Sequence, residues 1–524
     1  MIARRRTPLQ LGVFHSLFVA LTEEMGVTLQ RSALSPNIVE RRDHSCALFD
    51  GAGRTVALGD HMPVHLGSMA LSVQAVRESI QLAGGDVAVL NDPAAGGTHL
   101  PDLTLVQAVF LAGDREPAYY LANRAHHADV GGRSGGSMGL WMDVWQEGLV
   151  IPPVRLLAGG KRVEPTWRHI LAGVRTPGER EGDLAAQLAS LAIGERRLRA
   201  LVARYGRPLL DEMAGELLAY AARGVRALFG DMPDGAWAFA DGLDDDGAGG
   251  GALEIHVRLT VEGESARFDF RGTSPPARGP LNANPAIVRS ALLYVIRALC
   301  EDDLPANDGL LEPVAIEVPG GCLLDPGPGH PVAGGNVETS QRIVDAVLGA
   351  LAGAIPNRIP AASQGTMNNL ALSGAHADGT AFTYYETIAG GAGGHPEAPG
   401  ASAVHTHMTN SLNTPVEALE RAFPVRVVRY AIRTGSGGAG RHPGGDGVVR
   451  EFEALSPLEG TLLADRRRNG PWGLAGGRSG QPGRDGIERN GAREAIPGKG
   501  RFALAPGDRI RIETPGGGGW GEPR

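Results

Sequence analysis

Glycine is the residue that most constrains this chain, because 77 of its 524 residues are glycine, about twice the usual share of roughly 7%. No Gly-X-Y period is present and strong apolar segments separate the glycines, so neither collagen nor a disordered chain is indicated. Glycine allows tight turns and close approach of backbone to other groups. We therefore expect a folded protein in which glycine loops surround a site.

Size and charge narrow the class of protein further. A chain of 524 residues, 42% hydrophobic and 21% charged, can form roughly two to four globular domains. Its net charge of -8 argues against a nucleic-acid surface, and the absence of a run of 18 apolar residues argues against a membrane span. The widely spaced Cys46, Cys300 and Cys322 form no C-x-x-C pair. Neither a disulfide framework nor a thiolate zinc site is indicated, and a reducing, cytoplasmic setting fits.

Short strands and glycine loops are expected in the first 160 or so residues. Residues 1–26 are expected to be a helix of the fold and not a signal peptide, because His15 interrupts the apolar stretch and no small-residue cleavage site follows. The segment 44–58 predicts a hairpin turned at Asp50-Gly51. Residues 86–93 and 103–110 predict strands.

Helical spacing appears next, between residues 181 and 229, broken at 206–208. A strand pair follows over 253–270, and then helices at about 285–300 and 337–354. These separate blocks predict an α+β fold, multi-lobed, with mixed or antiparallel strands and helical segments, and not a doubly wound sheet. We expect an N-terminal α+β region with the candidate metal loops, a helical hairpin and a C-terminal α+β region, at residues 1–175, 176–235 and 236–524.

The loop before the strand 103–110 carries a His-x-x-Asp pair, His99 and Asp102, in "GGTHLPD". A second strand, 118–124, leads into "HHADVGG". If the two strands form a hairpin, the two loops end on the same side of it and can meet.

The second loop offers His126, His127 and Asp129. Two imidazoles with one carboxylate suit Zn²⁺, Mn²⁺ or Fe²⁺ and leave coordination positions open for water and substrate. The plainer interpretation is that each histidine only hydrogen-bonds the backbone of a glycine loop. The presence of such residues on two loops of one hairpin favours a metal site.

Further acids and imidazoles could surround this site as additional ligands, as partners of the ligands or as a general base. Individually, each is better explained as a structural or substrate-contacting residue than as a ligand. His405 and His407 are placed on one side of an expected strand. The full set is Glu40, Asp43, His44, Asp60, His61, His65, His405 and His407.

Two common motifs occur without the flanking secondary structure that their function requires. "GSGGAG" at 435–440 matches the dinucleotide pattern, but no helix pattern follows it to bind a phosphate. "GRSGG" at 132–136 lacks the strand and helix that a nucleophile elbow at Ser134 requires. No Walker A and no H-E-x-x-H motif occurs, so the chain gives no sign of binding ATP itself.

A series of motifs along nearly the whole chain resembles the hydantoinase B/oxoprolinase family. That family includes the B subunit of ATP-dependent N-methylhydantoinases, the C-terminal half of 5-oxoprolinases and the metal-carrying subunit of acetone and acetophenone carboxylases. The motifs are "ERRDHSCALFD", "GDHMPVHLGSM", "NDPAAGGTHLPDLTLV", "HHADVGG", "GNVETSQR", "ASQGTMNN", "YYETIAGGAGG", "HTHMTNSLNTPVEALE", "GSGGAGRHPGGDGVVREFE" and "TPGGGGWG".

The resemblance implies a division of labour between two subunits. A separate hydantoinase A-type subunit with an actin-like ATPase fold would bind ATP and phosphorylate the substrate oxygen. This chain would hold the divalent metal and open a cyclic amide of the hydantoin or 5-oxoproline type. A ketone carboxylase subunit and a non-catalytic scaffold for the ATPase partner are the alternatives.

The resemblance also implies which residues bind the metal, and the chemistry of the nearby acids and imidazoles gives the other expected roles. The metal ligands are expected to be His99, Asp102 and His126. The residues expected to serve catalysis beside them are His127, Asp129 and Glu40, with Asp43 as the other acid near the site. The expected substrate contacts are His61, His405 and His407.

Overall fold

The apolar strands of the first 160 residues pair into one seven-stranded antiparallel sheet, with the order β2-β1-β5-β4-β3-β6-β7. The computed structural model describes residues 8–59, 62–300 and 304–523. Both predicted hairpins, β1–β2 and β4–β5, are confirmed. The strands are β1 (His44–Asp50), β2 (Thr55–Leu58), β3 (Val87–Leu90), β4 (Asp102–Val109), β5 (Tyr119–His126), β6 (Val154–Ala158) and β7 (Lys161–Arg162).

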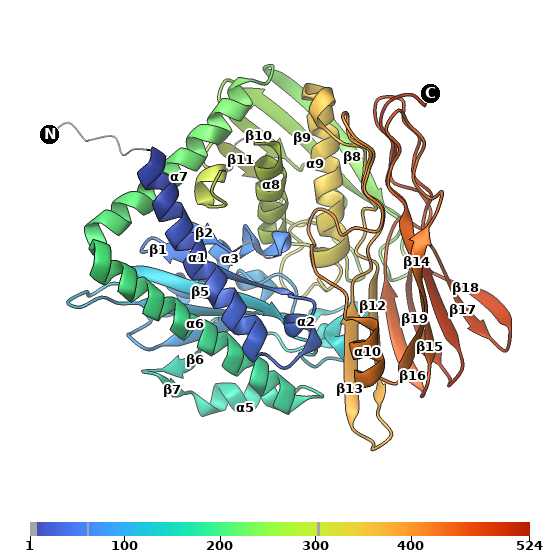
Figure 1. Cartoon of the computed structure of the whole chain (residues 1–524), viewed down its shortest axis with the longest axis horizontal. Helices are drawn as coiled ribbons and strands as arrows, with labels where there is room; N and C mark the ends of the chain where they lie inside the picture. Colours follow the sequence, from blue (N-terminus) through green and yellow to red (C-terminus); the bar gives the residue numbers. More distant parts are fainter. Residues whose placement is uncertain (1–7, 60–61, 301–303, 524) are drawn as a thin grey trace.

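Helices cover both faces of this sheet, which explains why its central strands are apolar on both sides. Helices α1 (Pro8–Ser32) and α6 (Pro177–Tyr205) lie together on one face (Figure 1), where Leu103 and Leu105 of β4 join their core. Helix α3 (Ser68–Ser79) covers the other face, which receives Val106 and Ala108. The N-terminal segment is therefore helical from Pro8, as predicted.

A second sheet, β11-β10-β9-β8, follows the helix α7 (Arg207–Gly230). Its strands are β8 (Gly235–Leu243), β9 (Leu253–Glu262), β10 (Ser265–Asp269) and β11 (Val314–Glu317), and β10–β11 pair in parallel. The predicted helices near 285–300 and 337–354 are α8 (Pro285–Leu299) and α9 (Ser340–Ala354). One turn of π-helix, Gly335–Thr339, precedes α9, a feature that helical periodicity does not distinguish.

Two further antiparallel sheets form the C-terminal part, beside α9 in Figure 1. They share one apolar core, to which Leu370, Tyr384, Phe452 and Ile510 contribute. The first has the order β13-β12-β16-β19 and the second β14-β15-β20-β17-β18. Their strands are β12 (Asn369–Ala375), β13 (Ala381–Glu386), β14 (Val425–Arg433), β15 (Gly447–Ala454), β16 (Leu458–Leu463), β17 (Arg484–Arg489), β18 (Ala492–Ile496), β19 (Lys499–Leu504) and β20 (Arg509–Glu513).

Short helices complete the fold, which is α+β with mainly antiparallel sheets, as predicted. They are α2 (Pro36–Val39), α4 (Val144–Glu147), α5 (Glu164–Ala172) and α10 (Val416–Ala422). Among the helices in the described ranges, none combines the length and the apolar character needed to cross a bilayer.

One local expectation was wrong, because His405 and His407 do not lie on a strand. Only Val404 pairs, through an isolated bridge with Gly390. His407 has a φ of 58°, which is left-handed backbone and ends any extended run. The alternation of histidines at this point therefore reflects a loop conformation and not a strand face.

Candidate metal centre

Three side chains meet where the β4–β5 hairpin begins and ends. Asp102, the first residue of β4, is the register partner of His126, the last residue of β5. His99 lies in the loop just before β4, and its ring centroid is 5.0 Å from that of His126. One potential ligand atom from each of these three residues lies within 4.8 Å of the others, and all three side chains are buried. The two loops that were expected to meet do meet.

His99 lies between a backbone carbonyl and the carboxylate of Asp102. Its Nδ1 lies 3.4 Å from the carbonyl oxygen of Ala333. Its Nε2 lies 3.3 Å from Oδ1 of Asp102 and 3.2 Å from the Nδ2 of Asn336. These contacts orient Nε2 toward the carboxylate, so that both groups can bind one cation.

His126 has one ring nitrogen engaged and one free. The side-chain amide of Asn37 contacts its Nδ1 at 3.0 Å. Its Nε2 is buried and makes no hydrogen bond to any of the described residues. Burial, together with the neighbouring His99, holds the pKa of His126 well below the usual value, so the ring is neutral near pH 7. This buried Nε2, which no described residue occupies, is the position at which a metal ion would bind, with loss of any proton on that nitrogen.

Asp102 is kept ionised by its surroundings. Burial acts to raise the pKa of Asp102, but His99 and His65 hold it well below the usual range. Nε2 of His65 lies 3.3 Å from Oδ2, and the hydroxyl of Thr98 donates to the same oxygen at 2.8 Å. One carboxylate and two imidazoles, each oriented by a further contact, fit a divalent ion of the zinc, manganese or iron type.

Two of the three residues expected to serve catalysis, His127 and Asp129, are engaged by residues outside this cluster. His127 follows His126 and points toward α6, where its Nε2 lies 3.0 Å from Oε1 of Gln187; burial lowers its pKa to about 4. The carboxylate of Asp129 pairs with Arg175 at 2.7 Å. Consecutive residues at the end of a strand face opposite sides, which separates His127 from His126.

Two acids follow closely in sequence after Asn37, a residue that contacts His126. Glu40 follows α2, and its Oε2 is buried without a hydrogen bond to the described residues. The backbone carbonyl of Asp43 accepts from the N–H of His126 at 3.0 Å. Burial raises the pKa of the Asp43 side chain, whose charge also interacts with Arg41 and with Asp102.

The expected substrate contacts occupy different surroundings. Burial and the charge of Arg41 lower the pKa of His405 to about 4. His407 lies between two helices, with Nδ1 3.3 Å from the hydroxyl of Tyr294 on α8 and Nε2 3.5 Å from Asp345 on α9. His61 lies outside the described residues.

Sequence reasoning missed the neighbours that come from distant segments. Asn37, Asn336 and Tyr385 contact the cluster from α2, the π-helical turn and β13. The last two lie in "GNVETSQR" and "YYETIAGGAGG", motifs that carried the family resemblance without an assigned role. Those motifs could have drawn attention to Asn336 and Tyr385, although a motif does not indicate which residues these side chains contact.

A comparison with known protein families decides to which family the chain belongs. The family model for hydantoinase B/oxoprolinase matches residues 7–523. The chain belongs to this family. The resemblance seen in the sequence motifs is thereby confirmed.

Relatives within the family differ in length. The 5-oxoprolinase 1 of Arabidopsis thaliana is 38% identical over 541 residues, which cover 98% of this chain and 42% of that protein. The chain therefore spans less than half of this relative. The B subunit of a putative D-/L-hydantoinase from Pseudomonas sp. strain NS671 is 30% identical over 527 residues, covering 95% of this chain and 87% of that one.

Two solved structures share the fold along almost the whole chain. The ATP-dependent caprolactamase from Pseudomonas jessenii superposes with a TM-score of 0.92 at 28% identity, covering 99% of this chain and 92% of that one. A nucleotide-free acetone carboxylase superposes with a TM-score of 0.90 at 17% identity, covering 99% and 76%. At that lower identity the likeness speaks for the fold alone.

Proposed function

We propose that this chain is the metal-binding, catalytic subunit of an ATP-dependent amidohydrolase that opens a cyclic amide of the hydantoin or 5-oxoproline type. The observation that carries the proposal is the buried cluster of His99, Asp102 and His126, with a free Nε2 on His126. Structural histidines in a protein interior normally have their ring nitrogens satisfied. A buried ring nitrogen without a hydrogen-bond partner, close to a carboxylate, fits a set of metal ligands better than a structural role.

Hydrolysis is favoured over carboxylation by the names of the relatives. Those at 38% and 30% identity are named as a 5-oxoprolinase and as the B subunit of a hydantoinase, whereas the acetone carboxylase is 17% identical. The 28% identical structural neighbour is named an ATP-dependent caprolactamase. These names concern cyclic amides, which supports ring opening by this chain.

A partner that activates the substrate belongs to the same proposal. The 5-oxoprolinase relative is more than twice as long as the matched region, and the hydantoinase relative is named as one subunit. We therefore assign ATP binding and phosphorylation to a hydantoinase A-type ATPase subunit and not to this chain.

The chemistry follows from the stability of amides. Resonance deactivates the carbonyl, and phosphorylation of the amide oxygen by the partner would create an imidate-like electrophile with a good leaving group, open to attack by water. A divalent ion, when bound by His99, Asp102 and His126, supplies a Lewis acid that eases deprotonation of water and stabilises developing negative charge.

The chain's own residues would divide the remaining work. Thr98 and His65 hold the Asp102 carboxylate at its Oδ2, and the carbonyl of Ala333 lies at Nδ1 of His99 while Nε2 of His99 faces the carboxylate. Among the expected proton acceptors, Asp129 is occupied by Arg175 and His127 faces Gln187. Glu40, whose Oε2 is buried and unbonded to the described residues, is assigned as the general base that accepts the proton of the attacking water.

The test uses the chain with its A-type partner. ATP-dependent opening of 5-oxoproline or hydantoin, without a requirement for bicarbonate, is the expected result. Glu40→Gln should retain the metal and lower turnover by a factor of about 10² to 10⁴, and Asp43→Asn is the matched comparison. Product formation that depends on bicarbonate would favour the carboxylase, and metal-free chain with full activity would refute the metal-assisted mechanism.

A further inference from the structure

The ring of Tyr385 forms one wall of the candidate metal centre. It stacks on the imidazole of His126, with centroids 4.9 Å apart and planes inclined by only 2°. The Arg41 guanidinium lies 4.7 Å from the same ring centroid, and its Nη1 donates to the backbone oxygen of Tyr385 at 3.1 Å. His126 is therefore held at its face by Tyr385 and at its Nδ1 edge by Asn37.

Asn369 fixes the other end of the tyrosine. The Tyr385 hydroxyl donates to Oδ1 of Asn369 at 2.7 Å. The amide nitrogen of Asn369 donates to Oε1 of Glu338 at 2.8 Å and to the carbonyl of Leu463 at 2.7 Å. Because both amide protons have acceptors, the orientation of the amide is settled and its oxygen must face the tyrosine.

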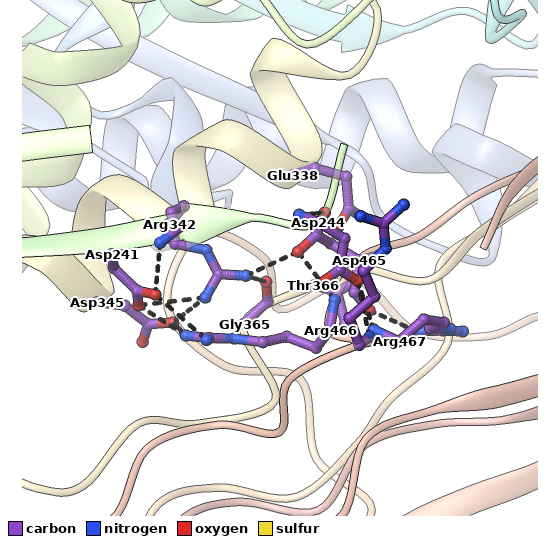
Figure 2. A network of polar contacts seen from close by, with 12 residues as sticks. Asp241, Asp244, Glu338, Arg342, Asp345, Gly365, Thr366, Asp465, Arg466 and Arg467 are labelled. Atoms are coloured by element: carbon purple, nitrogen blue, oxygen red, sulfur yellow. Dashed lines mark hydrogen bonds and ion pairs between the residues drawn. The ribbon is translucent and has the colours of Figure 1, made fainter. Parts of the chain in front are cut away.

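Glu338 anchors the arrangement from the π-helical turn. Its Oε1 also accepts from the N–H of Met367 at 2.9 Å, while its buried Oε2 has no hydrogen-bond partner in the described part of the chain. Burial raises the pKa of Glu338 to about 7. Figure 2 shows Glu338 beside the buried network around Asp465 and Arg342.

We propose that Tyr385, Asn369 and Glu338 form a positioning relay that fixes the ring of His126 for metal binding. The relay rests on the proposed metal function and extends it, because it assigns a role to residues of three separate motifs. Every hydrogen-bond donor along it has a specific acceptor, and the stacked ring leaves His126 little freedom to tilt. Contacts of this kind behind a metal ligand typically change metal affinity by about 10- to 100-fold when they are removed.

The adjacent tyrosine offers a matched control. Tyr384 precedes Tyr385 on β13 and faces the opposite side of the sheet, within the C-terminal core. Its hydroxyl is also buried and donates to Oε2 of Glu386 at 2.8 Å. Tyr384→Phe and Tyr385→Phe therefore each remove one buried hydroxyl bonded to a side-chain oxygen, but only Tyr385→Phe breaks the relay.

The experiment measures metal binding by the full chain. Chelator-treated protein is titrated with Zn²⁺ and with Mn²⁺ in competition with a chromophoric chelator. Tyr385→Phe should weaken binding by about 10-fold or more, and Tyr384→Phe should change it by less than about twofold. At saturation, the visible spectrum of the Co²⁺-loaded protein should be altered only in the Tyr385 variant. Equal affinities and spectra for the two variants would overturn the relay.

A second pair of variants tests the relay in case Tyr385→Phe does not fold. Glu338→Gln keeps an oxygen that can accept from Asn369 and Met367, so it should bind metal as the wild type does, whereas Glu338→Ala should bind more weakly. Equal weakening in both would contradict the hydrogen-bonded relay. If the wild type bound neither these two ions nor Fe²⁺, the proposed metal site would be wrong. The relay would then be judged by the ¹³C-histidine signal of His126, which Tyr385→Phe must shift if the relay exists.

Discussion

Asp102 and His126 are direct register partners, placed opposite one another at the first rung of the β4–β5 hairpin. Opposite residues in an antiparallel pair have their side chains on the same face and about 4.5 to 5.5 Å apart at Cβ. The carboxylate and one imidazole of the candidate site are thus set by strand pairing, and His99 reaches them from the preceding loop. The first prediction follows from this geometry.

Replacing Asp102 or His99 by Ala should abolish stoichiometric metal binding while the protein stays folded. Loss of a direct ligand is expected to lower affinity by about 100-fold or more, beyond the usual cost of losing a residue behind a ligand. Elemental analysis of purified variants and circular dichroism check the two halves of this expectation. His169→Ala, on the exposed side of α5, is the control, and full metal content in the Asp102 variant would contradict the assignment.

Gly97→Ala should distort the loop that carries His99. A Cβ at Gly97 would lie 2.1 Å from the carbonyl oxygen of Asn91, a backbone atom that cannot move independently. We expect a loss of about 1 to 3 kcal/mol in the free energy of unfolding, typical of overpacking, together with weaker metal binding. Gly84→Ala is the matched control, since a Cβ there meets nothing within 4 Å. Denaturant unfolding gives the comparison, and equal stabilities would show that the loop has room.

His405 should make the protein less stable in acid. Burial and Arg41 lower its pKa from the ordinary value of 6.5 to about 4. The unfolded state therefore binds more protons than the folded state between these values. The contribution of the neutral His405 ring to the free energy of unfolding is fully present above about pH 6.5 and is lost as pH falls toward 4. At about 1.4 kcal/mol per pKa unit, roughly 2 to 3 kcal/mol is lost by pH 4.5.

His405→Gln should accordingly flatten the acid side of the stability profile. The difference in unfolding free energy between pH 7 and pH 4.5 should shrink by roughly 2 to 3 kcal/mol. His169→Gln, on an exposed face, should leave the profile as it is. Parallel profiles for wild type and His405→Gln would show that the ring is not kept neutral by the fold.

Arg342→Ala should be strongly destabilising. The guanidinium is fully buried and binds Asp241, Asp345 and Asp465 at 3.1 to 3.3 Å (Figure 2). Removal of one partner leaves buried carboxylates uncompensated, at a cost of about 3 to 5 kcal/mol. The surface pair Arg226–Glu312 gives the contrast, because Arg226→Ala should cost no more than about 1 kcal/mol. Urea unfolding distinguishes the two, and similar losses would mean that the buried network contributes little.

Much of the local structure could be predicted because it depends on short-range patterns. The β4–β5 hairpin follows from two apolar runs that flank the loop 110–118, and α8 follows from helical spacing with Asn284 at its N-cap. The His405–His407 segment failed because a two-residue spacing cannot distinguish a strand from a loop with left-handed backbone at His407.

The sequence by itself determined the family and the α+β class. It also determined the meeting of His99, Asp102 and His126, because the start of β4 and the end of β5 lie at the same open end of one hairpin. Only the tertiary structure decided what surrounds them. Asn336 reaches Asp102 across 234 residues of sequence, and Tyr385 arrives from β13. No local pattern encodes such contacts, since they arise from the packing of separate sheets whose mutual placement depends on the whole buried core.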